Sequence, residues 1–350
     1  MVSPFNIPIS KSHMDEMRQF ITAILTLTHL PSYPGITEVD SPIVGFDFYL
    51  TDTGPKLIEI NTNPAALLLG FLLDAYHNHQ GNPAVMTQLK QAFKSIMDAK
   101  AASLIVILDE TPLLQHTYFE FMWFKSLFEQ WGYDCLILTP EELTLSNESC
   151  LMSPDGREVH VIYNRYCDFL LEEARSSHLN AAYTAGTVQL LPSPAHYRLL
   201  SDKLRLIDWS NPDFLSQFSL SPSDVACIQR VIPPVFWVST DRVDYAWEHR
   251  KSLFFKPAHG YGSRGVYRGK SISRPAFERL IKQPTIAQPF FVAPTYSTQY
   301  EGQDLTFKYD VRVYVVNGEI VLSSARLFIG QVTNLQTPLG GFASTTTLLA

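Results

Sequence analysis

The segment from Gly45 to Pro64 reads GFDFYLTDTGPKLIEINTNP and predicts a tight β-hairpin. Asp52-Thr53-Gly54 fits a three-residue connection whose last residue takes the left-handed backbone conformation, which glycine adopts at no steric cost. This connection pairs Thr51 with Pro55. The two runs on either side of the turn alternate as strands do, so the register of the whole hairpin follows from this pair.

The two arms of the hairpin bring three oxygen-bearing side chains together. Counting outward from the turn, Asp47 lies opposite Glu59, and Asn61 shares the face of Glu59 because strand side chains repeat with period two. Facing carboxylates repel unless a cation lies between them, and oxygen ligands suit Mg2+ or Mn2+. The hairpin therefore predicts a metal site. The alternative is that Glu59 and Asn61 form only the solvated face of an edge hairpin.

A glycine-rich segment lies in the last third of the chain. Residues 252–266 read SLFFKPAHGYGSRGV, an apolar strand that carries Lys256, then a loop that matches GxGxxG. A dinucleotide-binding loop of that pattern opens a helix, whereas here a strand-like run follows. Such a loop between two strands can close over a triphosphate, with backbone N–H groups and a lysine facing the phosphates. The kinase HRD and DFG motifs are absent, and a surface hairpin without a ligand is the alternative.

Residues 308–328 read KYDVRVYVVNGEIVLSSARLF, and Asn317-Gly318 between two apolar runs is a strong hairpin signal. Pairing outward from the turn places Asp310 and Arg312 on one face. Arg326 falls on the opposite face in this register, so it needs a β-bulge to meet the same ligand. For Asp310 or Arg312 alone, a structural ion pair is the alternative.

Together these segments resemble the ATP-grasp superfamily of carboxylate–amine ligases, in particular ribosomal-protein glutamate ligases and glutathione synthetases. SDKLRL supplies Lys203, FFKPAHGYGSRGV supplies Lys256, and IAQPFF resembles the hinge whose backbone holds adenine at Pro289 and Phe290. The resemblance implies Mg2+ (or Mn2+) at Asp47, Glu59 and Asn61, catalytic roles for Lys256, Arg312 and Arg326, and substrate contacts from Arg165, Asn63 and Asp168. It implies ATP contacts from Lys203, Lys256, His259, Gly260, Tyr261, Gly262, Ser263, Gln288, Pro289, Phe290, Asp310 and Asn334. For His259, a solvated loop histidine is the alternative.

The order of these motifs indicates a circular permutation. In those ligases the metal-binding hairpin follows the arginine strand, whereas here it comes first, as a similar segment does in eukaryotic-type glutathione synthetase. The expected fold class is α/β (α+β), a circularly permuted ATP-grasp fold with a small parallel α/β substrate domain inserted between its two sequence parts. The expected divisions are 1–99 (closing part with the metal hairpin), 100–198 (substrate domain), 199–285 (lid with the glycine-rich loop) and 286–350 (hinge and remaining core).

The substrate prediction starts from Arg165 in IYNRYCDF, which resembles a substrate-binding arginine of glutathione synthetase. Arg165 follows the expected strand 159–163, and ligands of open α/β sheets collect beyond the carboxyl ends of the strands. A guanidinium there can grip a carboxylate through two hydrogen bonds, and Asp168 could pair with an amine. The alternative is that Arg165 pairs with Glu172 or Glu173.

The periodicity predicts a helix from Ser12 to about Thr28, with Ser12 as N-cap and Asp15 three residues on. Further helices are expected over 84–99 and 117–130, and strands over 104–108, 135–138 and 159–163. Strands that alternate with helices in this way predict a small parallel α/β domain.

Composition favours a cytoplasmic enzyme. A net charge of −7 does not favour nucleic-acid binding, and the four cysteines lack metal-binding spacing. No signal sequence is evident, and the apolar run 65–73 is too short to span a membrane. We therefore expect no nucleic-acid or membrane partner and small-molecule acid and amine substrates, and a homodimer is left open.

The expected reaction joins a carboxylate to an amine at the expense of ATP, through an acyl phosphate, with an amino acid or short peptide as the acid. Positive charge from the lysines, arginines and Mg2+ would stabilise the transferred phosphoryl group. Two alternatives stay open, a non-catalytic nucleotide-binding protein of the same fold and an ATP-grasp kinase that phosphorylates a hydroxyl.

Overall fold

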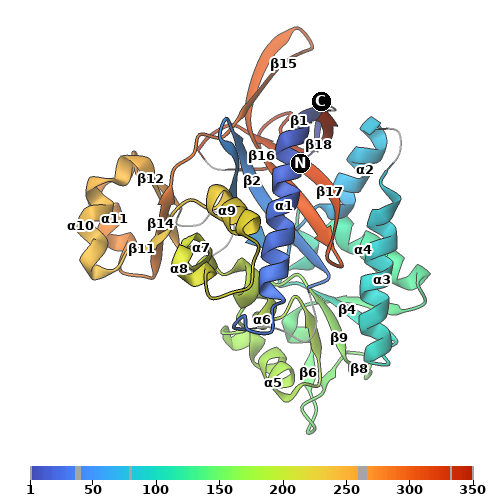
Figure 1. Cartoon of the computed structure of the whole chain (residues 1–350). Coiled ribbons are helices and arrows are strands. Elements are labelled where there is room, and N and C mark those ends of the chain that lie inside the picture. The colour runs from blue at the N-terminus through green and yellow to red at the C-terminus, as the bar shows by residue number, and fades with distance from the viewer. Residues whose placement is uncertain (1, 36–40, 79–80, 259–265, 332, 349–350) are drawn as a thin grey trace.

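The structure is a computed structural model of the 350-residue chain, which describes residues 2–35, 41–78, 81–258, 266–331 and 333–348. A large sheet in the order β1-β18-β17-β16-β2-β3, with β15 added on β16, forms its centre (Figure 1). Its strands are β1 (Val2–Ser10), β2 (Ile43–Thr51), β3 (Gly54–Asn61), β15 (Thr295–Tyr300), β16 (Gln303–Val316), β17 (Glu319–Phe328) and β18 (Gly341–Leu348).

The β2–β3 hairpin confirms that Asp47 lies opposite Glu59. The predicted turn is wrong by one residue, because Thr51 pairs with Gly54 rather than with the residue after it. Gly54 has the expected left-handed backbone, with φ of +94°. A β-bulge next to Asp47 inserts Ile58 as an extra residue and restores the predicted pairing beyond it. The two deviations cancel, so the polar face of the hairpin is the predicted one.

Strand β16 pairs with β2 on one side and with β17 on the other, and both pairings are antiparallel. Arg312 lies opposite Asp47, which confirms that the N-terminal hairpin packs against the strand that carries this arginine. A bulge between β16 and β17 brings Arg326 opposite Asp310. This is the bulge that Arg326 needs in order to meet the same ligand as Asp310 and Arg312. The relationship to other proteins by circular permutation stays a prediction.

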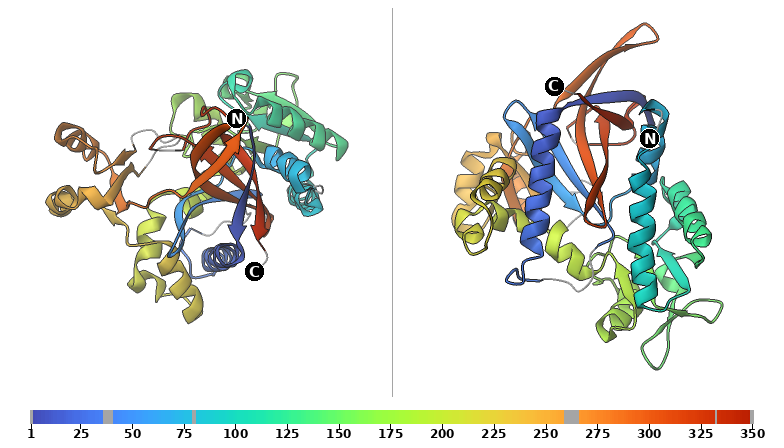
Figure 2. Two further views of the ribbon diagram at one scale, coloured as in Figure 1. Left: turned by 90° about the horizontal axis from the view of Figure 1, so that it is seen from above. Right: turned by 45° about the vertical axis from the view of Figure 1, so that its right-hand side comes forward.

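Helices cover both faces of the large sheet (Figures 1 and 2). On one face α1 (Lys11–Thr28) buries residues such as Phe20 and Ile24 against Phe46 and Phe48 of β2. On the other face lie α2 (Leu67–Asn78) and α3 (Pro83–Ala99). The N-cap of α1 is Ser10 and not Ser12, because the Ser10 hydroxyl accepts the backbone N–H of residue 13.

A second, all-parallel sheet in the order β10-β9-β4-β5 confirms the small α/β domain. Its strands are β4 (Leu104–Leu108), β5 (Asp134–Leu138), β9 (Val161–Asn164) and β10 (Gln189–Leu191), and its helices include α4 (Tyr118–Gln130) and α5 (Ser177–Ala185). A small antiparallel sheet of β6 (Thr144–Leu145), β7 (Leu151–Met152) and β8 (Glu158–Val159) lies beside it.

A third sheet, called the lid sheet, lies to one side of the large sheet (Figure 1). Its strands are β11 (Phe236–Trp237), β12 (Leu253–Pro257), β13 (Tyr267–Arg268) and β14 (Thr285–Pro289), and it is covered by α10 (Val243–Glu248) and α11 (Arg274–Leu280). Two short segments, α6 (Pro194–His196) and a π-helical turn (Tyr197–Ser201), lead to α7 (Arg205–Ser210), α8 (Pro212–Leu215) and α9 (Pro222–Val231).

The segment 205–231 shares its apolar core with α1 and the β2–β3 hairpin. Most of the buried hydrophobic residues of the lid sheet form a second core with α10 and α11, although Ile286 of β14 packs in the core shared with α1. The first part of the range expected for the lid therefore packs with the large sheet. The division of the chain into domains stays a prediction. Among the described helices, none is long and apolar enough to cross a membrane.

Candidate functional site

A cavity of about 900 Å³ lies between the lid sheet and the large sheet, whose strands β3, β2, β16, β17 and β18 all contribute lining residues. It collects side chains from segments that are far apart in the sequence, as the motif analysis predicted. The predicted residues that line it are Glu59, Asn61, Asn63, Lys203, Lys256, Gln288, Pro289, Phe290, Arg312, Arg326 and Asn334. The predicted loop residues His259, Gly260, Tyr261, Gly262 and Ser263 lie outside the described residues.

Two aspartates and two arginines form a buried quartet at the floor of the cavity, and it consists of Asp47, Asp310, Arg312 and Arg326. The Asp47 carboxylate accepts from Arg312 Nε at 2.6 Å, from Arg312 Nη2 at 2.7 Å and from Arg326 Nη2 at 2.8 Å. Arg326 Nε donates to Asp310 at 2.6 Å. Both carboxylates are fully buried and do not line the cavity, but each contacts residues that do, namely the arginines, Asn61 for Asp47 and Thr333 for Asp310.

Burial and pairing set the charges of this quartet. Burial alone would raise the pKa of Asp47, but the two guanidiniums outweigh it and lower the pKa. For Asp310, burial prevails and raises the pKa, although Arg326 opposes it. Burial would lower the pKa of Arg326, yet the carboxylates of Asp310 and Asp47 raise it. Both arginines therefore present a positive charge to the cavity, held in place by two carboxylates behind them.

The predicted metal ligands do converge. Asn61 Nδ2 lies 3.2 Å from an oxygen of Asp47 and 3.5 Å from an oxygen of Glu59. The cations that relieve the repulsion at Asp47 are guanidiniums, so within this set Glu59 and Asn61 are the residues that face the cavity. The described residues contain no group of three or more His, Cys, Asp or Glu side chains that could hold a metal. Metal binding at Asp47, Glu59 and Asn61 stays a prediction.

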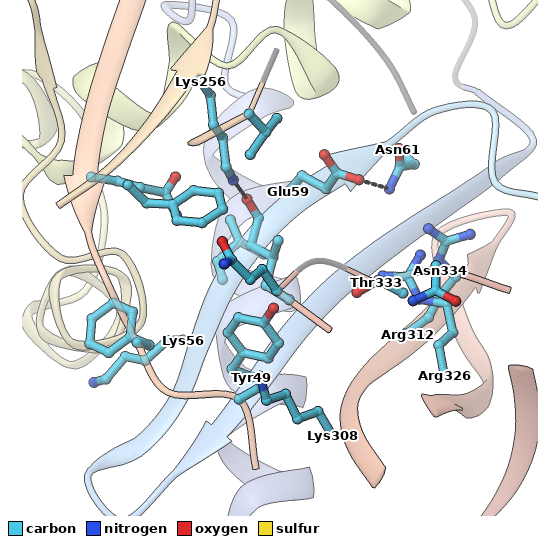
Figure 3. Close-up of a pocket in the computed structure, with 18 of the residues that line it drawn as sticks. Tyr49, Lys56, Glu59, Asn61, Lys256, Lys308, Arg312, Arg326, Thr333 and Asn334 are labelled. Carbon is cyan, nitrogen blue, oxygen red and sulfur yellow. Dashed lines mark hydrogen bonds between the residues drawn. The ribbon is translucent and has the colours of Figure 1, made fainter. Parts of the chain in front are cut away.

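Lys256 projects from β12 to the opposite side of the cavity, with Glu59 and Asn61 between it and the two arginines (Figure 3). Its Nζ donates to the carbonyl of Ile58, the extra residue of the bulge, at 2.9 Å. Burial lowers the pKa of Lys256 to about 8, with Glu59 opposing the change and Lys203 adding to it. Burial also lowers the pKa of Lys203.

The predicted hinge forms an aromatic wall of the cavity. Phe290 packs on Phe254, with 6.4 Å between the ring centroids. The guanidinium of Arg268, from strand β13 of the lid sheet, lies 4.1 Å from the centroid of the Phe290 ring. The backbone N–H of Phe290 donates to the carbonyl of Ser252 at 2.8 Å, and adenine binding by the backbone at Pro289 and Phe290 stays a prediction. Gln288 has a buried Oε1 atom with no partner among the described residues, which leaves an acceptor for a ligand.

The structure does not bring all predicted residues to the cavity. Arg165 is buried outside it, where Nη1 donates to the Pro64 carbonyl at 3.2 Å, and it pairs with neither glutamate of the alternative. Asp168 accepts from the Ser176 hydroxyl at 2.5 Å and from two backbone N–H groups, so it fixes a turn. Asn334 lines the cavity, but its amide shapes its own loop by donating to the Ile329 carbonyl at 2.9 Å.

Several cavity residues were not predicted. They include Tyr49, Lys56, His116, Arg268, Lys308 and Thr333. Tyr49 and Lys56 are a cross-strand pair of the hairpin, and Tyr49 shares the parity of Asp47, so the strand period could have found it. Thr333, whose hydroxyl donates to Asp310 at 2.5 Å, comes from an irregular loop that carries no periodic signal.

The sheet order, the lid sheet and the cavity between them are those expected of an ATP-grasp fold, and the comparison with solved structures finds similar folds. The chain is similar over 98% of its length to 90% of a protein from Methylobacillus flagellatus KT provisionally named gamma-glutamylcysteine synthetase, with 9% identity and a TM-score of 0.56. It also matches the ATP-grasp ligase PsnB, solved with a phosphomimetic variant of its minimal precursor, Mg and ADP, at 13% identity and a TM-score of 0.40, over 66% of this chain and 75% of PsnB. No family model and no curated protein matches the sequence.

Proposed function

We propose that this protein is an ATP-dependent carboxylate–amine ligase that acts through an acyl phosphate. The observation that carries the proposal is the convergence of Lys256, Arg312 and Arg326 around Glu59 and Asn61 in one cavity. These residues come from four strands in three separate segments of the chain. A purely structural explanation would account for the buried ion pairs, but not for the four lysines that face the same cavity.

The cavity fits a polyanion. Among the described lining residues, Glu59 is the one carboxylate, whereas seven lysines and arginines contribute positive charge. Mg-ATP, when bound, supplies the phosphoryl group that turns a carboxylate oxygen into a leaving group. Lys203, Lys256 and the two arginines would balance the charge of the phosphates, and Glu59 and Asn61 would hold Mg2+ (or Mn2+), with Asp47 behind them. The unpartnered Gln288 acceptor fits a donor such as an amino group of the base.

We propose roles for these residues from their positions. Arg312 and Arg326 are fixed by buried carboxylates, so their charges need no reorganisation when negative charge spreads over a transferred phosphoryl group. The acid and amine would enter beside these arginines, where Asn63 has a buried Oδ1 without a partner among the described residues. We propose an amino acid or short peptide as the acid and a cytoplasmic location, since the free thiols of Cys135, Cys150 and Cys227 are consistent with a reducing compartment.

The test is phosphate release from Mg-ATP in the presence of amino acids, dipeptides and polyamines in pairs, followed by mass spectrometry of the products. A product whose mass equals acid plus amine minus water would support the ligase. A phosphorylated product that forms without any amine would identify a kinase. Binding of Mg-ATP without turnover in any pair would favour a non-catalytic nucleotide-binding protein.

A further inference from the structure

The segment that follows β3, residues 62–68, runs from the β2–β3 hairpin into the first turn of α2 and forms part of the cavity wall through Asn63, Pro64 and Ala65. Side chains from separate elements hold its backbone. The contacts are Ser201 Oγ with the Thr62 N–H at 2.8 Å, Arg165 with the Pro64 carbonyl at 3.2 Å, the Tyr314 hydroxyl with the Ala65 carbonyl at 2.9 Å, and Glu120 with the N–H groups of Ala66 and Leu68 at 2.7 and 2.9 Å.

Glu120 makes two of these contacts from a buried position in another domain. It lies on α4 of the small domain, is 3% exposed, and uses both carboxylate oxygens on backbone N–H groups at the start of α2. A carboxylate at a helix N-terminus is favoured by the helix dipole. Burial raises the pKa of Glu120, while the Arg165 guanidinium and the two N–H groups oppose that change. Glu120 thus closes the first turn of a helix that belongs to a different part of the fold.

The held segment includes an unfavourable backbone conformation. Ala66 has φ of +69°, in the left-handed region that residues with a side chain rarely adopt. Such a conformation persists where the surroundings impose it, and it is common near binding sites. The Ala66 N–H is one of the two groups that Glu120 accepts, so the contact and the unusual conformation occur at the same residue.

We propose that Glu120 and Arg165 are positioning residues, which touch no ligand but fix residues 62–68 and thereby set the direction of Glu59, Asn61 and Asn63. This inference rests on the proposed function of the cavity. In this proposal Arg165 does not bind a substrate carboxylate, as its sequence context predicts. Its guanidinium instead donates a hydrogen bond to the main-chain carbonyl of Pro64 in the cavity wall. The small α/β domain then contributes to the site through the backbone it holds.

The test is the variant Glu120→Gln, because an amide keeps the shape of the side chain but cannot accept both N–H groups. Glu129→Gln is the matched control, since it makes the same change on the same helix at a half-exposed side chain. Calorimetry measures the affinity for ATP with Mg2+ and for ATP in EDTA. We expect about tenfold weaker Mg-ATP binding in Glu120→Gln, with little change in EDTA, since residues that orient metal ligands typically contribute about 10- to 100-fold to metal affinity.

Tyr314→Phe provides a second variant, because it removes the hydrogen bond to the Ala65 carbonyl and keeps the buried ring. We expect the same metal-dependent loss. Equal losses with and without Mg2+, or no loss in either variant, would overturn the inference and leave a structural role. A wild-type protein that binds no Mg-ATP would instead overturn the proposed function, so the two failures can be told apart.

Discussion

Raising the pH from 7 to 9 should weaken ATP binding, and Lys256 should be responsible. Its side chain is 4% exposed, and burial is the main reason that its pKa falls from 10.5 to about 8. Phosphate binding favours the charged form, whose population in the free protein drops from about nine-tenths at pH 7 to about one-tenth at pH 9. The dissociation constant should therefore rise about tenfold over this range.

Folding stability should change in the opposite direction. In the unfolded chain Lys256 keeps its proton up to about pH 10.5, so the unfolded state binds more protons than the folded state between about pH 8 and 10.5. The free energy of unfolding of the ligand-free protein therefore rises with pH across this window. The full difference corresponds to about 3 kcal/mol, at about 1.4 kcal/mol for each tenfold change in proton affinity.

Calorimetric titration with ATP in EDTA at pH 7, 8 and 9 measures the binding effect directly. Lys256→Arg keeps its charge throughout this range, so its affinity should lose most of the pH dependence. Lys308→Arg is the control, because Lys308 lines the same cavity with its Nζ on the Gly330 carbonyl, and this variant should behave like the wild type. The same pH dependence in wild type and Lys256→Arg would refute the assignment.

Three further substitutions test other parts of the site. Glu59→Gln should abolish Mg-dependent turnover and leave the melting temperature unchanged, since Glu59 has no part in the buried quartet; wild-type turnover at limiting Mg2+ would exclude it as a ligand. Asp310→Asn leaves Arg326 buried with less compensation and should lower the free energy of unfolding in urea by about 3 kcal/mol; a loss below about 1 kcal/mol would mean that Asp310 contributes little. Asp168→Ala should cost about 1 kcal/mol in the same assay, as the loss of a capping side chain does, with Mg-ATP affinity unchanged by calorimetry; weaker binding would return Asp168 to the site.

The sequence was sufficient to predict the polar face of the β2–β3 hairpin, but not how the backbone achieves it. The turn is one residue shorter than the glycine suggests, and the bulge at Ile58 compensates. The bulge lies on the edge strand β3, which pairs with β2, and no local pattern in the sequence encodes it. The bulge that brings Arg326 opposite Asp310 carries no sequence signal of its own. It could be inferred only by assuming that Arg326 and Arg312 bind the same ligand, and the structure confirms the bulge.

The predictions that failed involve residues whose partners come from another part of the fold. Arg165 stands at the end of a parallel strand, where ligands often bind, yet the chain segment after β3 occupies that place. Ser10 and not Ser12 caps α1, because the strand β1 runs up to the helix, and β1 forms only by pairing with β18 at the other end of the described chain. Neither contact leaves a periodic signal in the sequence.

The buried quartet constrains how this protein can evolve. Its four charges are shared among three neighbouring strands, and each arginine contacts Asp47. A substitution that removes any one charge leaves another without compensation in the interior, which is strongly unfavourable. In related chains these four positions should therefore change together or not at all, and an ancestor that lost one of them would have had to replace its partner before the site could function again.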